Sequence, residues 1–216
     1  MRLSFVLALC LLAVSSPAVS AGGPARDCAE CPDMVRLQRF SLGRTEVTVA
    51  QYGACVAAGA CRPRQPRWQE DDMPMTEVTA LDAEDYAAWL SRRTGKRYRL
   101  PDEAEWEWAA RAGTTTAYPW GDAMEEGRAV CQHCDPRFNH RPAPVATMAA
   151  NPWGLFDMHG NVWEWTRDCW NGDCGRRVVR GGSWYFVPGQ SRSDARAAEN
   201  YRVWSYDIGL RVLRED

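Results

Sequence analysis

Residues 151–166 read Asn-Pro-Trp-Gly-Leu-Phe-Asp-Met-His-Gly-Asn-Val-Trp-Glu-Trp-Thr, and residues 180–184, Arg-Gly-Gly-Ser-Trp, follow shortly after them. The order of tryptophan, glycine and asparagine fits neither the 3.6-residue period of a helix nor the two-residue alternation of a strand. Glycine permits unusual backbone angles, and tryptophan fills large volumes in a core. These stretches therefore predict compact loops that belong to one particular fold.

The first residues have the pattern of a secretory signal peptide. Met1-Arg2 precedes an apolar run at 3–14, and Val19-Ser20-Ala21 has the small residues of a cleavage site. A membrane anchor is the weaker interpretation, because the run is too short to span a bilayer comfortably. No later segment is long and apolar enough to be a transmembrane helix. We expect residues 1–21 to be a signal peptide, 22–35 a short mature leader and 36–216 one domain, in a periplasmic or secreted protein.

The overall composition is that of a globular protein without a nucleic-acid partner. The formal net charge is -2, and no basic stripe runs through the sequence. Aromatic residues make up 11% of the chain and include 11 tryptophans, which argues strongly against disorder.

Cysteine usage also indicates export. Of the nine cysteines, Cys10 leaves with the signal peptide, and an even number in an exported chain predicts disulfides. The simplest pairing is local, although the sequence does not fix the connectivity. Zinc is the alternative, because two pairs have Cys-x-x-Cys spacing and His133 lies inside one of them. The remaining eight fall in near-neighbour pairs: Cys28/Cys31, Cys55/Cys61, Cys131/Cys134 and Cys169/Cys174.

The pattern of regular structure predicts one α+β domain that is rich in loops. Thr48 and Asp82 are candidate N-caps for two helices, and Asp102 with Glu105 resembles the capping box of a third. Gly95 is the candidate stop of the second helix. The expected helices are 49–58, 82–94 and 101–113, and the expected short strands are 36–40, 96–100, 178–180 and 209–213.

In its motifs the chain resembles the formylglycine-generating enzyme, or sulfatase-modifying factor, family. The resemblance implies a C-type-lectin-like α+β domain with little regular structure. The motifs occur in the family's order along most of the mature chain: Thr45-Glu-Val-Thr-Val-Ala-Gln-Tyr52, Pro74-Met-Thr-Glu-Val78, Tyr98-Arg-Leu-Pro-Asp-Glu-Ala-Glu-Trp-Glu107, Tyr118-Pro-Trp-Gly121, residues 151–165, Arg180-Gly-Gly-Ser-Trp184 and Gly209-Leu-Arg-Val212.

The resemblance also implies where an active site would lie. The family's founding enzymes use copper and oxygen to oxidise a cysteine of a client sulfatase, through a cysteine pair shortly after the Gly-Gly-Ser motif. Here the matching positions are Phe186 and Ser191, and no cysteine follows Cys174. Phenylalanine cannot bind a metal and serine is a poor ligand for Cu(I), so we do not expect copper.

The Gly-Asn-Val-Trp-Glu loop resembles a structural calcium site of the family. The matching positions are Asp157, Gly160, Val162 and Glu164. Two carboxylates and two backbone carbonyls are hard oxygen ligands of the kind that Ca²⁺ prefers. We expect one structural calcium ion; the alternative is that the two acids only hydrogen-bond within the loop.

Aromatic and arginine residues gather where the family's enzymes build their site, and such residues are typical of a recognition surface. Trp184 is expected in the core. Ser183 and His159 are expected to be structural, and a metal cluster of His133, His140 and Asp135 is a weaker alternative. The candidate ligand or partner surface consists of Tyr185, Phe186, Ser191, Arg192, Arg196, Tyr201, Arg202 and Trp204.

Two functions follow as hypotheses. The first is an exported binding or accessory protein for an envelope partner or a peptide, because the scaffold is intact while the cysteine pair is missing. The second is a protein- or peptide-modifying oxidoreductase with altered chemistry. Its candidate groups, none with a diagnostic spacing, are Ser191, Asp194, Glu199, Tyr201 and Asp207. The sequence does not indicate an oligomeric state.

Overall fold

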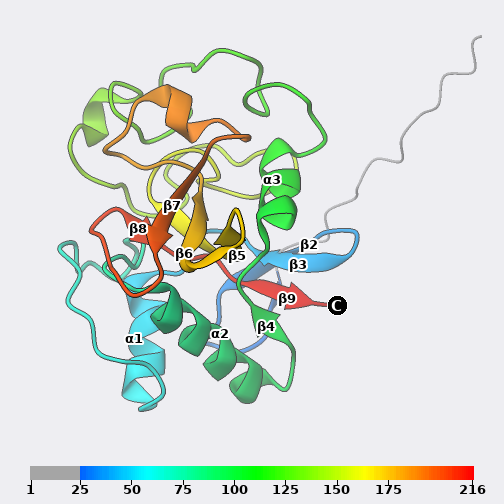
Figure 1. Cartoon of the computed structure of the whole chain (residues 1–216), viewed down its shortest axis with the longest axis vertical. Helices are drawn as coiled ribbons and strands as arrows, with labels where there is room; N and C mark the ends of the chain where they lie inside the picture. Colours follow the sequence, from blue (N-terminus) through cyan, green and yellow to red (C-terminus); the bar gives the residue numbers. More distant parts are fainter. Residues whose placement is uncertain (1–24) are drawn as a thin grey trace, which may run out of the picture.

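The computed structural model describes residues 25–216, and Figure 1 shows them as short strands, a few helices and long connecting loops. The predicted signal peptide lies outside the described residues. Within the described residues, no helix has the length and apolar composition needed to cross a bilayer. The helices are α1 (Val49–Ala57), α2 (Ala80–Thr94) and α3 (Glu103–Arg111), with 3-10 turns η1 (Pro136–Phe138) and η2 (Pro188–Ser191).

The strands form two sheets. One sheet has the order β1-β2-β3-β9-β4 and is antiparallel throughout; the other has the order β7-β6-β5-β8, with β5 and β8 parallel. In Figure 1 α1 and α2 lie below the sheets, and the irregular chain between α3 and β5 fills the top of the view. The strands are β1 (Ala25–Arg26), β2 (Asp33–Arg36), β3 (Phe40–Gly43), β4 (Tyr98–Arg99), β5 (Trp163–Trp170), β6 (Asp173–Arg180), β7 (Arg196–Asn200), β8 (Ile208–Gly209) and β9 (Leu213–Glu215).

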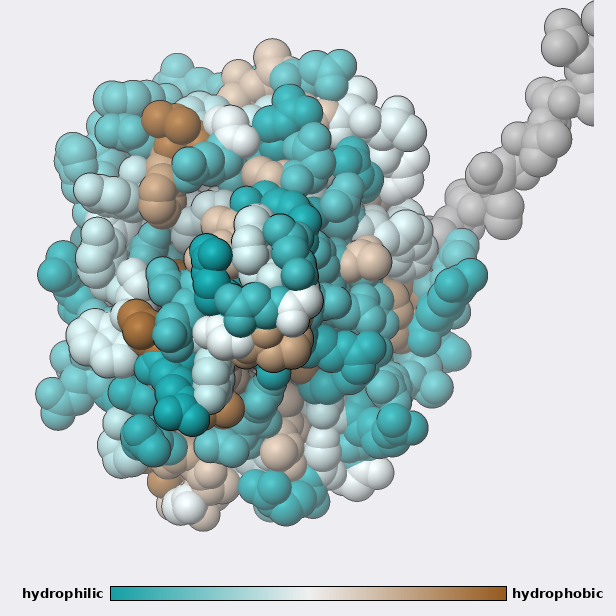
Figure 2. Space-filling view, in the orientation of Figure 1, coloured by the Kyte–Doolittle hydropathy of each residue, from teal (hydrophilic) through white to brown (hydrophobic). Residues whose placement is uncertain are grey.

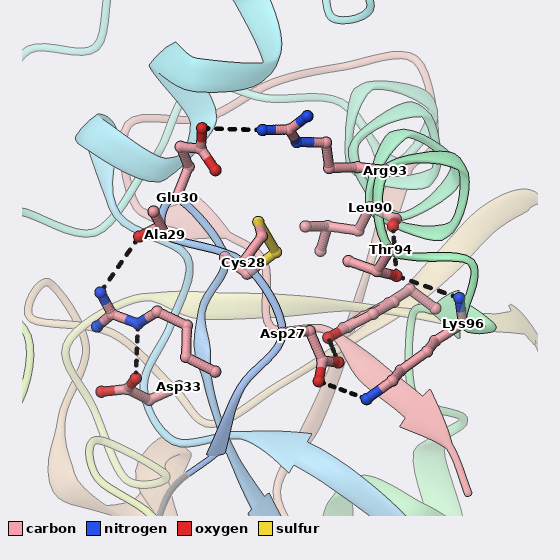
Figure 3. Close-up of a disulfide and its surroundings, with 12 residues drawn as sticks. Asp27, Cys28, Ala29, Glu30, Asp33, Leu90, Arg93, Thr94 and Lys96 are labelled. Carbon is pink, nitrogen blue, oxygen red and sulfur yellow. Dashed lines mark hydrogen bonds and ion pairs between the residues drawn. A yellow bond between two sulfur atoms is a disulfide. The ribbon is translucent and has the colours of Figure 1, made fainter.

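The first described residues are part of the domain. The structure therefore differs from the predicted leader at 22–35, because β1 and β2 extend the five-stranded sheet and Cys31 is buried. Figure 3 shows the Cys28–Cys31 disulfide beside Leu90 of α2. Asp27 accepts a hydrogen bond from Lys96 Nζ at 2.6 Å, which ties this segment to the end of α2 (Figure 3).

Each helix begins at a capping box. Thr48 caps α1 and Asp102 caps α3, as predicted, and in each case the side chain three residues later bonds back to the cap. The cap of α2 was predicted one turn too late. Thr79 is its N-cap, and Asp82 is the third helical residue, whose carboxylate accepts the Thr79 N–H.

The core has three parts, and aromatic residues dominate the largest of them. It packs Trp163 and Trp165 of β5 against α1 and α2. A second part holds Trp106 of α3 against β2 and β3. The third lies under the loops and includes Trp184, whose predicted burial is confirmed. The tryptophans of the motifs thus supply much of the buried apolar area that stabilises the domain.

The tryptophan-glycine stretch is a loop that leads into a strand. Residues 151–162 are irregular, as predicted, whereas Trp163 opens the eight-residue strand β5. Gly160 has a φ of +84°, and a Cβ there would lie 2.3 Å from the Val130 carbonyl oxygen. The motif requires glycine at this position because two backbones meet there without room for a side chain.

All eight cysteines of residues 25–216 are in local disulfides. The pairs are Cys28–Cys31, Cys55–Cys61, Cys131–Cys134 and Cys169–Cys174. The zinc alternative finds no support, since His133 is exposed beside the third disulfide.

Candidate functional site

A groove of about 450 Å³ crosses the four-stranded sheet. Trp163, Val179 and Ile208 come from three of its strands. The segments 185–190 and 205–207 also border the groove. Its lining residues are Trp163, Val179, Tyr185, Phe186, Gly189, Gln190, Ala195, Arg196, Ala197, Ala198, Glu199, Ser205, Tyr206, Asp207 and Ile208. A separate cavity of about 360 Å³, lined by none of these residues, lies beside Trp108.

The Gly-Gly-Ser turn fixes one side of the groove. Gly182 has a φ of +77°, and a Cβ there would lie 2.5 Å from Ser191 Oγ and 2.7 Å from the Gln190 carbonyl oxygen. The turn η2 therefore packs directly on the backbone of Gly182, as only glycine allows. This close approach holds segment 185–190 in place along the groove.

The two positions that match the family's copper ligands carry an aromatic ring and a buried hydroxyl. Phe186 lines the groove, and its ring lies edge-on to Trp163 with centroids 5.9 Å apart. Ser191 is completely buried, and its Oγ has no hydrogen-bond partner within residues 25–216. Ser191 was predicted on the partner surface, which is wrong because η2 buries it against Gly182.

The other predicted surface residues divide into two groups. Tyr185, Phe186 and Arg196 line the groove, with Tyr185 52% exposed. The second group lies outside the groove lining. Its members are Arg192, which pairs with Asp194; Tyr201, which is half-buried beside α2; Arg202, whose Nε donates to Tyr201 Oη; and Trp204, which is 51% exposed.

Exposed large apolar side chains are few and gather near this site. Tyr185 and Val187 project from one segment, and Val203 and Trp204 project from the loop between β7 and β8; all four are about half exposed, and Leu81 of α2, 44% exposed, is the fifth within the described residues. Figure 2 shows a mainly hydrophilic face, with hydrophobic residues in small separate patches. The apolar rim of the groove is thus a local feature rather than a general property of the surface.

Asp207 is the carboxylate built into the groove. Its side chain accepts hydrogen bonds from Ser183 Oγ, at 3.1 Å, and from Ser205 Oγ. It is only 6% exposed, and its backbone oxygen accepts the Trp163 N–H. The structural role expected for Ser183 therefore includes holding a carboxylate at the groove.

The groove floor was not predicted. Trp163, Val179 and Ile208 meet there because β5 pairs with β8 on one side and with β6 on the other. The two-residue spacing of Trp163 and Trp165 was the available signal, since alternate residues of a strand share a face.

A second cluster of charged groups lies in the interior around the predicted calcium ligands. Glu164 accepts hydrogen bonds from Arg211 Nη2 at 2.7 Å, from Arg211 Nε at 3.0 Å and from Trp106 Nε1 at 2.6 Å. Glu164 and Arg211 are both completely buried. Because these donors fill the acceptor sites of the carboxylate, Glu164 neutralises Arg211 and is not free to bind a metal ion.

Asp157 and Glu46 bring two further carboxylates to this cluster. Asp157 Oδ2 accepts the Ala146 N–H at 2.6 Å, and burial raises the pKa of Asp157 to about 6. Sequence reasoning missed Glu46, which accepts a hydrogen bond from Asn161 Nδ2 at 3.0 Å. Burial raises the pKa of Glu46 as well, and its Oε2 has no hydrogen-bond partner within residues 25–216.

These residues fit a cation only if backbone oxygens contribute. Within the described residues, no three His, Cys, Asp or Glu side chains are grouped so that they could hold a metal ion. The side-chain oxygens that could contribute are Glu46 Oε2, which has no hydrogen-bond partner within residues 25–216, and the Asp157 carboxylate; the carbonyls of Gly160 and Val162 are those that the family resemblance implies. Hard oxygen donors of this kind suit Ca²⁺.

His159, which was expected to be structural, and the three residues of the alternative metal cluster all lie outside the groove lining. His159 is buried, its Nδ1 lies 2.8 Å from the Ser191 carbonyl oxygen, and burial lowers its pKa to about 4. His133 and His140 are exposed, and Asp135 is held by Arg137 at 2.6 Å. These three side chains do not form the alternative metal cluster.

The fold and the groove define a domain of the formylglycine-generating type. The family model described as "Sulfatase-modifying factor enzyme 1-like domain" matches residues 16–216. The chain belongs to this family, and its α+β domain has the predicted C-type-lectin-like fold.

Similar proteins include relatives named as formylglycine-generating enzymes and relatives named as inactive forms of that enzyme. The formylglycine-generating enzyme of Mycobacterium tuberculosis is 41% identical over 124 residues, which are 50% of this chain and 39% of the relative. The inactive Cα-formylglycine-generating enzyme 2 of Bos taurus is 38% identical over 123 residues, 52% of this chain and 39% of the relative. The matched stretch therefore spans well under half of each relative.

The solved structure of PvdO from Pseudomonas aeruginosa matches over a greater length. Its TM-score is 0.79 at 29% identity, and the match covers 94% of this chain and all of that one.

Proposed function

We propose that this protein is an exported, non-classical family member that binds a peptide segment of a partner in the cell envelope. The observation that carries the proposal is the groove with Phe186 in its lining and no thiol. An aromatic ring at that position offers apolar contact and no metal ligand. The protein then acts as a binding or accessory protein and does not generate formylglycine through copper.

The groove supports peptide recognition through its shape and its edge. Its lining includes the consecutive residues 195–199, and within the described sheet β7 pairs on one side only, with β6. A free strand edge offers backbone hydrogen bonds to an extended segment, and adjacent pockets select its side chains. Exposed Tyr185 and Trp204 add amphipathic anchors of the kind that dominate binding interfaces.

Export is the second part of the proposal. The apolar run with its small-residue cleavage site supports a signal peptide at 1–21, and disulfides are typical of oxidising compartments such as the periplasm. One structural calcium ion is the third part. Asp157, Glu46 and the carbonyls of Gly160 and Val162 would hold it, while Glu164 supports the site by neutralising Arg211. The ion would supply positive charge to a buried acidic cluster.

A second candidate is a peptide-modifying oxidoreductase with altered chemistry. It is favoured by one observation: Asp207 and Ser205, which are hydrogen-bonded to each other, place a carboxylate and a hydroxyl in the same groove. Stoichiometric iron or copper in protein purified from a periplasm would support this candidate.

A displayed library of random peptides tests the binding role. Peptides selected on the mature protein are measured against Gly189→Trp, because Gly189 lines the groove and a Cβ there meets no atom within 4 Å. The indole would fill the groove without disturbing the fold. We expect binding to be lost in Gly189→Trp and kept in Glu126→Gln, a change at an exposed acid outside the groove. Copper-dependent conversion of a Cys-x-Pro-x-Arg peptide would contradict the proposal.

A further inference from the structure

The Cys169–Cys174 disulfide is the most accessible of the four. Cys174 is exposed and Cys169 is half-buried, whereas each of the other three bonds includes at least one buried cysteine. Exchange begins when an external thiolate attacks one sulfur atom of a disulfide, so exposed disulfides exchange more readily than buried ones. Because the two ends of this bond differ in exposure, an external thiol meets Cys174 first.

The hairpin that carries this disulfide is already closed by its backbone. Asn171 and Gly172 join β5 to β6 and have positive φ angles of 49° and 88°, as in a two-residue hairpin turn. On its other side, β6 is paired with β7 over residues 176–180. A bond between cysteines five residues apart closes only a short loop, which removes little entropy from the unfolded chain. The fold therefore depends little on this bond.

Cys174 lies in a bulge of β6. Cys169 pairs with Arg177, and the next residue of β5 pairs with Asp173, so residues 174–176 have no partner on β5. A bulge interrupts the ladder of backbone hydrogen bonds locally. The two sulfur atoms can therefore separate by a change within the bulge, without the loss of a backbone pair between β5 and β6.

Arg177 holds a positive charge against the other sulfur atom. Its Nη1 lies 3.6 Å from Cys169 Sγ and donates to the Arg167 carbonyl oxygen at 2.5 Å. Within residues 25–216 its ion pair is with Glu84, at 3.5 Å, and its buried Nε has no hydrogen-bond partner there. The guanidinium therefore has donor capacity left for a sulfur anion. A nearby cation stabilises a thiolate, and a more stable thiolate leaves a disulfide faster.

From these contacts we propose that the Cys169–Cys174 disulfide is a thiol-exchange site, at which a small thiol of the glutathione class becomes attached to Cys174. The thiolate of the small thiol attacks Cys174 Sγ and forms a new S–S bond. The Cys169–Cys174 bond breaks, and its electron pair leaves on Cys169 Sγ beside Arg177. One disulfide is consumed and one is formed, so the step needs no oxidant or reductant. None of these three residues lines the groove, and the inference is independent of the proposed binding function.

Trapping with reduced glutathione tests the site. The mature protein is incubated with glutathione and quenched with N-ethylmaleimide, and the state of each cysteine is assigned by peptide mass mapping. We expect glutathione on Cys174 and the maleimide on Cys169, while the buried Cys55–Cys61 bond stays intact. Glutathione found mainly on Cys169, or equal reaction of the two disulfides, would overturn the proposal.

Arg177→Gln tests the direction of the exchange. Without the guanidinium, we expect the mixed disulfide to form about fivefold more slowly or less, and the preference for Cys174 over Cys169 to fall. Arg176→Gln is the matched control and should react as the unmodified protein does, because the Arg176 guanidinium lies over the Trp170 ring, at 5.7 Å from its centroid.

A conservative variant separates charge from folding. Arg177→Lys keeps the positive charge and should retain most of the rate, and thermal midpoints establish that each variant is folded. If Arg177→Gln does not fold, the peptide mapping of the unmodified protein and of Arg177→Lys still decides, since both should carry glutathione on Cys174. Equal rates and equal preference in folded Arg177→Gln and in the unmodified protein would contradict the role of Arg177.

Discussion

The Phe186 ring stands edge-on to the Trp163 indole, with centroids 5.9 Å apart and planes inclined by 70°. In the family resemblance Phe186 matches the first cysteine of the copper pair. Here the position contributes to apolar packing between β5 and segment 185–190. The same fold therefore presents a hydrophobic groove where its founding enzymes carry thiolates.

Phe186 should contribute to stability as well as to binding. Phe186→Ala removes a half-buried ring from its contact with Trp163, and we expect a loss of about 1–3 kcal/mol, below the range for fully buried rings. Urea denaturation measures the change. Val187→Ala, at a side chain 49% exposed, is the control and should stay within about 0.5 kcal/mol. Equal effects of both changes would mean that the ring does not pack as described.

The buried pair of Glu164 and Arg211 should be the most sensitive charged contact. Arg211→Met leaves Glu164 buried beside Glu46 and Asp157 without its cation, and we expect a loss of about 3–5 kcal/mol. Glu125→Gln breaks the exposed pair with Arg128 and should cost less than about 1 kcal/mol. Chemical denaturation of both variants measures these losses of unfolding free energy. Similar losses would contradict the account of Arg211 as the buried cation that neutralises Glu164.

Asp27 should make stability depend on pH below about 4. Burial raises its pKa, but hydrogen bonds from Lys96, Tyr98 and Arg214 outweigh burial and lower the pKa from 3.8 to about 2. The ionised form therefore stabilises the folded state above pH 4, and this contribution, about 2 kcal/mol, is lost as the pH falls from 4 to 2.

The comparison with Asp27→Asn checks the sign of this effect. The variant should be less stable than the unmodified protein at pH 6, and the difference should shrink toward zero near pH 2. Denaturation curves at pH 6, 4, 3 and 2 give the measurement. A difference that stays constant over this range would show that the charge of Asp27 is not responsible.

Calcium should raise the thermal midpoint if the proposed site exists. Binding to the folded state alone stabilises it in proportion to the logarithm of the free ion concentration. We expect the midpoint to rise with millimolar calcium and to return after a chelator is added. Glu46→Gln and Asp157→Asn should each abolish the shift. An unchanged thermal midpoint of the unmodified protein at several millimolar calcium would contradict the proposed calcium site.

The sequence predicted the fold through its local signals. The capping boxes at Thr48 and Asp102 fix helix starts by hydrogen bonds between residues three apart, so their pattern can be read from the chain. At α2 the same logic failed by one turn. Both Thr79 and Asp82 are good caps, and they form a capping box in which Thr79 is the N-cap and Asp82 the third helical residue; Ala80 and Ala83, in the first turn, are buried in the core.

The sequence predicted the site residues only where they are neighbours within one segment of the chain. Tyr185 and Phe186 follow the Gly-Gly-Ser motif directly, and both line the groove. Ser191 was misplaced because its burial depends on contact with Gly182, nine residues away. Glu46 joins Asn161 across 115 residues, and no local pattern reports such a pairing.

One measurement tests the central claim most directly: a selected peptide is titrated onto the mature protein and onto Gly189→Trp, and the recovered peptide is weighed by mass spectrometry. The account predicts saturable binding to the unmodified protein, loss of binding in the variant and an unchanged peptide mass, with or without copper. A peptide recovered with an oxidised cysteine, or one that binds both proteins equally, would contradict it.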